Sequence, residues 1–425
     1  MKSRMLTCVT TFTLLSALAI PIWLAAQDHH QTPPTYSVPC TSTGGTDGGS
    51  GGSICNLPLY RQQADPGSRT VPPQCLGQPI PPHGVMASVC QLVPRSTKTR
   101  QASNDLPPNR DRGTYSTFDV PGAGQGPYEG TFPYAVNDLG VVVGGYFDAS
   151  FNLHGFLRTP DGTITSFDVP NSIDTNPASI NVWGAIAGEY LDASFNSHGF
   201  LRTPNGAFTT FDPGSPTGIN DLGVIEGDYA DSSFVFHGFV RSASGNITSF
   251  DPSGSVATFA SGINLAGMVT GGYRDSNGGF HGYVRSADGG ITSFDVPGGS
   301  STGGAGINLW GAITGTYGDA NGTHGFLREP NGAITTFDAP GAANGTNPYS
   351  INFSGDITGV YVDANYAYHG FLRDHDGTIT TLDAPGSGQG NYQGTIANSI
   401  NLWGVITGSY NDANNVGHGF LRIPH

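Results

Sequence analysis

The stretch His154-Gly-Phe-Leu-Arg158, followed by a Pro-Asp-Gly turn and Thr163-Ile-Thr-Ser-Phe-Asp168, decides the fold because copies of it recur along the chain. The other copies begin at His198, His237, His281, His324, His369 and His418. Asp-Gly, Asn-Gly and Ser-Gly pairs tolerate the positive φ angles of two-residue hairpin turns. We therefore predict that each copy forms two antiparallel strands joined by a tight turn.

A two-residue turn also fixes the register of the hairpin. It predicts that Arg158 faces Thr165, that Phe156 faces Phe167, and that Gly155 leaves space beside Asp168. The same register is predicted for the other complete copies.

The hairpin is one half of a larger repeat of about 44 residues, a length typical of propeller blades. A first strand ends in Ile/Val-Asn, an Asn-x-x-Gly turn follows, and a second strand reads Val/Ile-x-Gly-x-Tyr. An Asp-led loop then leads to the hairpin. The link from Phe-Asp-x-Pro to the next copy varies in length, as expected where an outer strand crosses to the next blade.

The two ends of the repeat region complement each other. The last copy stops at Arg422 without a fourth strand, whereas residues 114–119 form a fourth strand that precedes the first copy. Joining them removes an open edge. The sequence predicts an all-β, seven-bladed β-propeller over residues 113–425, closed by its N-terminal strand.

The residues before the repeats have a different character. Lys2, Arg4 and the apolar run Leu14–Ala26 predict a secretory signal at 1–26, too short to be a membrane span. Residues 27–112 are rich in Pro, Gly, Ser and Thr and predict a disordered linker. It holds Cys40, Cys55, Cys75 and Cys90, which suggest two disulfides, with Cys40–Cys55 and Cys75–Cys90 the favoured pairing of three and zinc the weaker alternative.

Charge separates these regions and excludes some partners. Residues 113–425 hold eight arginines and no lysine against 27 acidic residues, a net charge of −19, whereas residues 1–112 carry +4. Phosphate recognition needs clustered cations, so nucleic acid and anionic membrane surfaces are excluded as partners. We expect an exported protein that is secreted, periplasmic or at the cell surface.

The repeats resemble the HAF family of extracellular repeats, named for a His-Ala-Phe motif after an Ile-Asn-x-x-Gly-x-Val-x-Gly segment. The resemblance covers residues 113–425, with Gly in place of Ala in each copy and Tyr283 in place of one Phe. It implies export and a repeat architecture, and it implies no particular activity.

Residues present in every copy are interpreted as parts of the blade. We expect the aspartate five or six residues earlier, such as Asp148, or a loop backbone to hold each histidine. We expect the repeat arginines to be packed and hydrogen-bonded within or between blades, with the Phe-Asp carboxylates, such as Asp168, as their nearest anions. The Asp-led loops lack the spaced carboxylates of a calcium loop, so we favour Asx-type turns, with calcium at some blades as the alternative. No other metal or cofactor is predicted.

Residues that are not repeated are the candidate site. Trp183, Trp310 and Trp403 share one turn position, where they either bind a sugar ring or partner, or cover the neighbouring blade. Two long crossing loops, 121–130 and 385–394, carry the other candidates. These are Tyr128, Glu129, Tyr392 and Gln393.

Glu189, Glu226 and Asp228 lie on second strands and are the candidate acids for catalysis, with a solvated acidic patch as the alternative. Because no nucleophile–base signature occurs, the sequence favours a non-enzymatic module that binds a glycan or protein partner. A polysaccharide hydrolase or lyase and a purely structural surface protein are the alternatives.

Overall fold

The computed structural model describes residues 113–425, and every regular element within them is a β-strand. The predicted signal peptide (1–26), the predicted linker (27–112) and Cys40, Cys55, Cys75 and Cys90 lie outside the described residues. Among the described residues, no helix is long and apolar enough to cross a membrane.

The strands pair into four-stranded antiparallel units, numbered here in chain order. Unit 1 contains β2 (Gly130–Val136), β3 (Val142–Phe147), β4 (Leu153–Arg158) and β5 (Ile164–Phe167). Unit 2 contains β6 (Asp174–Ile180), β7 (Ile186–Leu191), β8 (Ser197–Arg202) and β9 (Phe208–Phe211). Unit 3 contains β10 (Ser215–Ile219), β11 (Ile225–Ala230), β12 (Phe236–Arg241) and β13 (Ile247–Phe250). Unit 4 contains β14 (Ser255–Ile263), β15 (Val269–Asp275), β16 (Phe280–Arg285) and β17 (Ile291–Phe294).

The later units follow the same order. Unit 5 contains β18 (Ser301–Ile307), β19 (Ile313–Asp319), β20 (Gly322–Arg328) and β21 (Ile334–Phe337). Unit 6 contains β22 (Thr346–Ile351), β23 (Ile357–Val362), β24 (Tyr368–Arg373) and β25 (Ile379–Leu382). Unit 7 contains β26 (Gly394–Ile400), β27 (Ile406–Asn411) and β28 (Gly417–Ile423), and its fourth strand is β1 (Thr114–Phe118).

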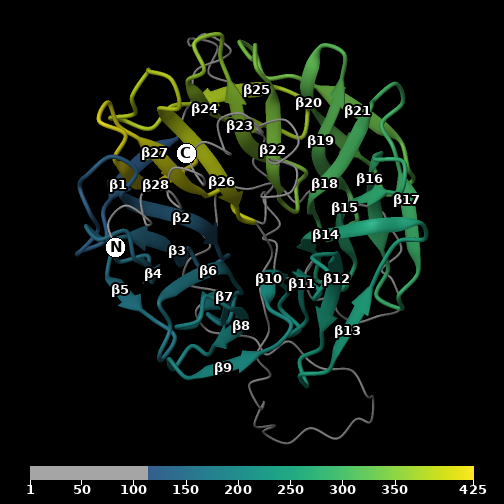
Figure 1. Ribbon diagram of the computed structural model, residues 1–425. Coiled ribbons are helices and arrows are strands. Elements are labelled where there is room, and N and C mark those ends of the chain that lie inside the picture. The colour runs from purple at the N-terminus through teal and green to yellow at the C-terminus, as the bar shows by residue number, and fades with distance from the viewer. Residues whose placement is uncertain (1–112) are drawn as a thin grey trace, which may run out of the picture. The chain divides into compact units, whose positions relative to one another are not determined.

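The pairing of β1 with β28 joins the two ends of the described chain. It is antiparallel, from Thr114 opposite Ile423 to Phe118 opposite Gly419. The units of this β-propeller follow one another around a common centre, which brings β28 beside β2 (Figure 1).

The hydrophobic core lies between successive units rather than inside one sheet. The third strand of each unit supplies a fully buried ring, such as Phe156, Phe200 or Tyr283, to a cluster that it shares with the preceding unit. One such cluster joins Val120 and Leu421 of unit 7 to Val136, Val142 and Phe156 of unit 1. Each unit therefore depends on its neighbours for burial of its apolar faces.

Asparagines at the ends of the first strands connect the units near the centre. The amide Nδ2 of Asn137 donates to the carbonyl of Asn181 at 2.7 Å, and Asn401 donates to the carbonyl of Asn137 at 2.9 Å. Asn220, Asn264, Asn308 and Asn352 each make the same bond to the next unit. Asn181 is the exception, because its buried Nδ2 has no partner in residues 113–425.

The predicted hairpin register was wrong by one residue. Arg158 lies opposite Ile164 and Gly155 lies opposite Phe167, and the other complete hairpins share this register. The cause is the turn, in which Thr159 N–H bonds to the Thr163 carbonyl and Gly162, at φ 91°, bonds to the Thr159 carbonyl. This geometry is a three-residue turn with a bulge at the glycine. Gly155 therefore leaves room for the Phe167 ring, which a Cβ would approach to 2.6 Å.

Candidate functional site

The two ends of each unit form two faces of the molecule. We call the end that carries the Asn-x-x-Gly turns and the hairpin turns the turn face. We call the end that carries the Asp-led loops and the links between units the crossing face. The alternation of antiparallel strands places each set of connections at its own end.

Each repeat histidine lies between two aspartates near the crossing face, as the sequence predicted for its structural role. In unit 2, His198 Nδ1 lies 2.8 Å from Asp212 and Nε2 lies 3.4 Å from Asp192. The imidazole also stacks on Tyr190, with ring centroids 5.1 Å apart. The hydrogen bond with Asp212, the largest cause, raises the pKa of His198, while burial opposes the rise. We call this arrangement the histidine clamp.

Six of the repeat arginines pack between units, as the sequence predicted, although the Phe-Asp carboxylates were expected to be their nearest anions. Those carboxylates hold the histidines, and the arginines lie instead over phenylalanine rings of the preceding unit. The guanidinium carbon of Arg202 is 4.6 Å from the Phe167 centroid, and Arg158 lies over Phe118 at 5.0 Å. Arg241, Arg285, Arg328 and Arg373 repeat the contact. Cation–π stacking lets a charged group fill an apolar junction.

The three tryptophans lie on the turn face, each against the next unit. Trp403 Nε1 donates to the Asp138 carbonyl at 3.0 Å, and Trp183 Nε1 donates to the Asp221 carbonyl at 3.3 Å. Trp310 packs against Phe353 with ring centroids 5.0 Å apart. All three indoles are half-buried. Their geometry matches the alternative in which they cover a neighbouring unit, and ligand binding by them stays a prediction.

The aspartates beneath two of these indoles complete the same junctions. Asp138 Oδ1 accepts the Leu402 N–H and Asp221 Oδ1 accepts the Val182 N–H, at 2.9 and 3.1 Å. Burial, with the nearby charge of Asp138, raises the pKa of Asp221 to about 7. The turn face is thus tied together by polar bonds between units.

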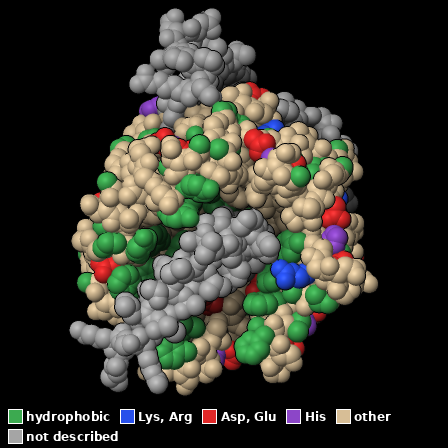
Figure 2. All heavy atoms as spheres, turned by 45° about the horizontal axis from the view of Figure 1, so that its top comes forward, with side chains coloured by type: hydrophobic (Ala, Val, Ile, Leu, Met, Phe, Trp, Pro, Cys, Tyr) green, Lys and Arg blue, Asp and Glu red, His purple; other side chains and the backbone are tan. Residues whose placement is uncertain are grey.

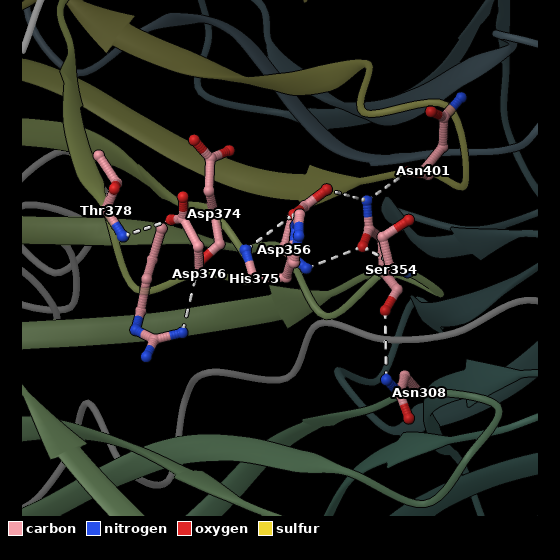
Figure 3. A network of polar contacts seen from close by, with 10 residues as sticks. Asn308, Ser354, Asp356, Asp374, His375, Asp376, Thr378 and Asn401 are labelled. Atoms are coloured by element: carbon pink, nitrogen blue, oxygen red, sulfur yellow. Dashed lines mark hydrogen bonds and ion pairs between the residues drawn. The ribbon is translucent and has the colours of Figure 1, made fainter. Parts of the chain in front are cut away.

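Unit 6 adds a polar cluster of its own to the turn face (Figure 3). Asp356 Oδ1 accepts the main-chain N–H of His375 at 3.0 Å, and Oδ2 accepts Asn352 Nδ2 at 3.1 Å. Burial raises the pKa of the neighbouring Asp374, and the charge of Asp356 adds to the rise. Across residues 113–425, no three His, Cys, Asp or Glu side chains are arranged to hold a metal ion. The cluster joins two turns of one unit.

The acid and the amide of the two long crossing loops bond to the main chain of their own loops. Glu129 is buried and accepts the Gly126 N–H at 2.6 Å, and Gln393 accepts the Gly390 N–H at 2.9 Å. Tyr128, in contrast, is exposed, and its N–H donates to the Asn415 carbonyl. Glu129 and Gln393 therefore shape the loops, and Tyr128 is the outward aromatic residue of the first loop, whereas Tyr392 is half-buried.

Tyr392 belongs to a group of three tyrosines on the crossing face of unit 6. Its N–H donates to the Tyr366 carbonyl at 2.9 Å, and its ring lies 6.2 Å from that of Tyr368. Tyr366 is half exposed, at 49%. The two crossing loops thus lie beside the Asp-led loops of units 6 and 7.

Sequence reasoning missed four exposed aromatic residues of the crossing face, which occupy the fourth position of Asp-led loops. They are Phe151, Phe195, Phe234 and Tyr366, which we call the aromatic tips. Phe195 is 75% exposed and Phe234 is 86% exposed. The signal was present in the sequence, since Gly278, Gly322 and Asn415 take the same position in the other units.

The aromatic tips also have an unfavourable backbone conformation. Phe151, Phe195, Phe234 and Tyr366 have φ between 61° and 63°, and Tyr128 and Tyr392 have φ of 67° and 60°. The remaining non-glycine residues with positive φ in the described chain are Asn171 and Asn415. A bulky side chain in this region costs about 1 kcal/mol or more relative to glycine. Phe195 and Phe234 are largely exposed, so the packing of their rings offsets little of this cost.

The candidate acids do not form one open site. Glu226 is fully buried and accepts the Thr217 hydroxyl at 2.9 Å, and Asp228 is 2% exposed. Burial raises the pKa of Glu226 to about 8. Glu189 is half-buried in unit 2 and accepts hydroxyl bonds from Ser215 at 2.7 Å and Ser197 at 3.2 Å. Two of the three acids are therefore closed to a substrate.

The loop aspartates keep a negative charge on the crossing face. Asp148 Oδ1 accepts N–H bonds from Ser150 and Asn152, at 2.7 and 2.9 Å. Although burial opposes it, these bonds lower the pKa of Asp148 to about 2. The carboxylates serve their own turns, as predicted for Asx-type loops, and calcium binding stays untested.

On the face in Figure 2, hydrophobic side chains gather in patches and Lys or Arg side chains are sparse.

Comparison with known proteins finds likenesses among solved structures at low sequence identity. No protein-family model matches the sequence, and no curated protein matches it. A streptogramin B lyase structure aligns at 15% identity over 72% of this chain and 97% of its own, with a TM-score of 0.46. A catalytically inactive virginiamycin B lyase from Staphylococcus aureus with quinupristin aligns at 15% identity over 73% of this chain and 100% of its own, at 0.45. The β-propeller domain of the Trilobed protease from Pyrococcus furiosus aligns at 8% identity over 68% and 93%, at 0.46.

Proposed function

We propose that this protein is an exported, non-enzymatic binding module whose crossing face recognises a glycan. The aromatic tips carry the proposal. At the fourth position of a loop, where glycine or asparagine would be unstrained, four units carry an exposed aromatic ring. Exposed aromatic rings stack on the apolar faces of sugar rings.

In this proposal, a seven-bladed propeller closed by β1 is the scaffold that holds the aromatic tips. The β1–β28 pairing, the Asn401–Asn137 hydrogen bond and the apolar cluster between units 7 and 1 support closure. A closed ring holds all its loops in fixed relative positions, which suits binding at several points. Export through a signal at 1–26, a linker at 27–112 and membership of the HAF repeats complete the proposal.

Mutation of the tips tests this function directly. Wild-type protein and a Phe151→Ser, Phe195→Ser, Phe234→Ser variant would be compared by affinity electrophoresis in gels containing soluble polysaccharides of different backbone and charge. We expect at least one polysaccharide to retard the wild type, and the triple variant to lose about tenfold or more in affinity. Binding to no polysaccharide, or equal binding by the variant, would contradict the proposal.

Leu222→Ser is the matched control. Leu222 is an exposed apolar residue, at 48%, but it lies in an Asn-x-x-Gly turn on the turn face. Its replacement removes apolar surface from the opposite end and should leave retardation unchanged. If it weakens binding as much as the triple variant, the site lies elsewhere.

A hydrolase or lyase is less favoured because Glu226 and Asp228 are buried. Glu189 is the one candidate acid with exposed surface. Turnover of a polysaccharide that is lost in Glu189→Gln, with binding retained, would favour the enzyme instead.

A further inference from the structure

Arginine is largely withdrawn from the surface of the described chain. Six repeat arginines lie 4.6–5.0 Å from phenylalanine centroids in the preceding unit, and Arg422 is buried. Arg274 is exposed at the crossing-face end of β15, in unit 4, whose loop carries Gly278 in place of an aromatic tip. The units that carry the tips therefore present almost no positive charge from arginine.

Every aromatic tip lies in a loop whose leading aspartate belongs to a histidine clamp. In unit 2, Phe195 follows Asp192 by three residues, and His198 joins Asp192 to Asp212. Asp148 and Asp168 stand in the same relation to Phe151, and Asp231 and Asp251 to Phe234. Each histidine clamp keeps a net negative charge even when the imidazole is protonated, because it holds two carboxylates. Asp212 leaves 69% of its side chain open to solvent, and Asp168 leaves 48%.

We infer that the glycan of the crossing face is a polymer of amino sugars with free amines. An exposed ring beside carboxylates suits a ligand that joins an apolar sugar face to an ammonium group, since cations are attracted both to ring faces and to anions. A neutral glycan would leave the carboxylates unused, and an acidic one would be repelled. This inference rests on the proposed function and names the ligand class of that site.

The repetition of the tips favours a polymer over a single sugar. Units 1, 2 and 3 are consecutive, and each presents a tip and a clamp on the same face. A chain that contacts several tips at once gains affinity through effective concentration, although each contact is weak. Free monosaccharide should therefore bind far more weakly than an oligomer.

The test compares oligomers of β-1,4-linked glucosamine with oligomers of N-acetylglucosamine of equal length, by calorimetry on the full chain. At about pH 6, below the pKa of an amine, and about 20 mM salt, we expect the free-amine oligomer to bind about tenfold more tightly. The difference should shrink as salt is added, because exposed charges are screened.

A charge variant locates the effect on the crossing face. The double variant Asp168→Asn, Asp212→Asn removes two exposed charges there and keeps side-chain oxygens for the histidines. It should weaken the free-amine oligomer about threefold to tenfold and leave the acetylated oligomer unaffected. Asp161→Asn with Asp288→Asn removes two charges from hairpin turns on the turn face, and it should change neither affinity.

The outcomes separate this inference from the proposed function. Equal affinity for the two oligomers, or binding of a neutral or acidic polysaccharide alone, overturns the amine inference and leaves a glycan module standing. Binding to no polysaccharide overturns both. Polylysine that binds as tightly as the free-amine oligomer, without loss in the Phe151, Phe195, Phe234 variant, overturns the inference because attraction would then be a matter of charge alone.

Discussion

Turns of the same backbone geometry occur on the turn face and on the crossing face, at opposite ends of each unit. Asn137–Val141 on the turn face and Asp148–Asn152 on the crossing face both close with the same pair of backbone bonds, and both need positive φ at the fourth residue. On the turn face that residue is glycine in every unit, such as Gly140. On the crossing face it is aromatic in four units. The difference teaches that the turn face fills this position with the unstrained residue, whereas the crossing face accepts strain in order to carry aromatic rings.

Bonds between units should make the turn face costly to mutate, and Asn401→Ala provides the largest expected effect. The change removes the hydrogen bond that Asn401 Nδ2 donates to the Asn137 carbonyl. It also removes the two hydrogen bonds that Asn401 Oδ1 accepts from the main-chain N–H groups of Trp403 and Val405. At about 1 kcal/mol each, we expect a loss of about 3 kcal/mol in the free energy of unfolding, measured by urea denaturation.

Asn181→Ala is the control for that measurement. The Nδ2 of Asn181 has no partner in residues 113–425, and its Oδ1 accepts one bond, from Ala185. The expected loss is about 1 kcal/mol. Equal losses at both positions would show that the asparagine bonds between units contribute little.

The two faces should also differ in the sign of their pH dependence. The pKa of Asp221 on the turn face is raised to about 7, so the folded state holds a proton that the unfolded chain has lost. Its contribution to stability is present below about pH 4 and is lost as pH rises toward 7. Because the group is half-buried, we expect a change of about 1–2 kcal/mol, which Asp221→Asn abolishes in urea denaturation at several pH values.

Asp148 on the crossing face should behave in the opposite way. Its pKa is lowered to about 2, so its contribution is present above about pH 4 and is lost as pH falls toward 2. Asp148→Asn should therefore reduce the acid sensitivity of the protein. If Asp221→Asn and Asp148→Asn changed the pH dependence of the unfolding free energy in the same direction, this distinction between the faces would be lost.

The tryptophans provide a smaller test within the turn face. Trp403→Phe loses the Nε1 bond to the Asp138 carbonyl, whereas Trp310 Nε1 is buried without a partner in residues 113–425. We expect Trp403→Phe to cost about 1 kcal/mol more than Trp310→Phe in unfolding free energy. A glycan that protects these indoles from fluorescence quenching would instead place a ligand on the turn face.

The smallest expected effect on the free energy of unfolding is an increase rather than a decrease. Phe234→Asn replaces an exposed ring at φ 61° with a residue that tolerates this conformation. We expect the free energy of unfolding to rise by less than about 1 kcal/mol while glycan affinity falls. A clear loss of stability in thermal denaturation would mean that the ring packs on its surroundings, and the argument from strain would fail.

Much of the fold follows from the sequence because its signals are local and repeated. The four-strand repeat, the hairpins and the pairing of residues 114–118 with the final strand could all be predicted from the recurrence of one pattern. The register was missed by one residue because Gly162 supplies a bulge rather than the second position of a two-residue turn.

Contacts between units were harder to predict. Nothing near Arg202 in the sequence indicates that its guanidinium lies over Phe167 of the preceding unit. The site was obscured for a related reason. Only an alignment of the Asp-led loops, with Gly278 and Gly322 at the position of Phe234, indicates that this position favours glycine, and the positive φ of Phe234 agrees with it.

The β1–β28 pairing has a mechanical consequence. Thr114 begins β1 directly beside Ile423 near the end of β28, so a force applied between residues 113 and 425 loads one pair of bonds at a time. Strands loaded in this way separate one residue pair at a time and withstand far less force than strands that are sheared along each other. In single-molecule stretching we predict that β1 detaches first and at low force, before any other strand yields; a first rupture elsewhere would be inconsistent with this prediction.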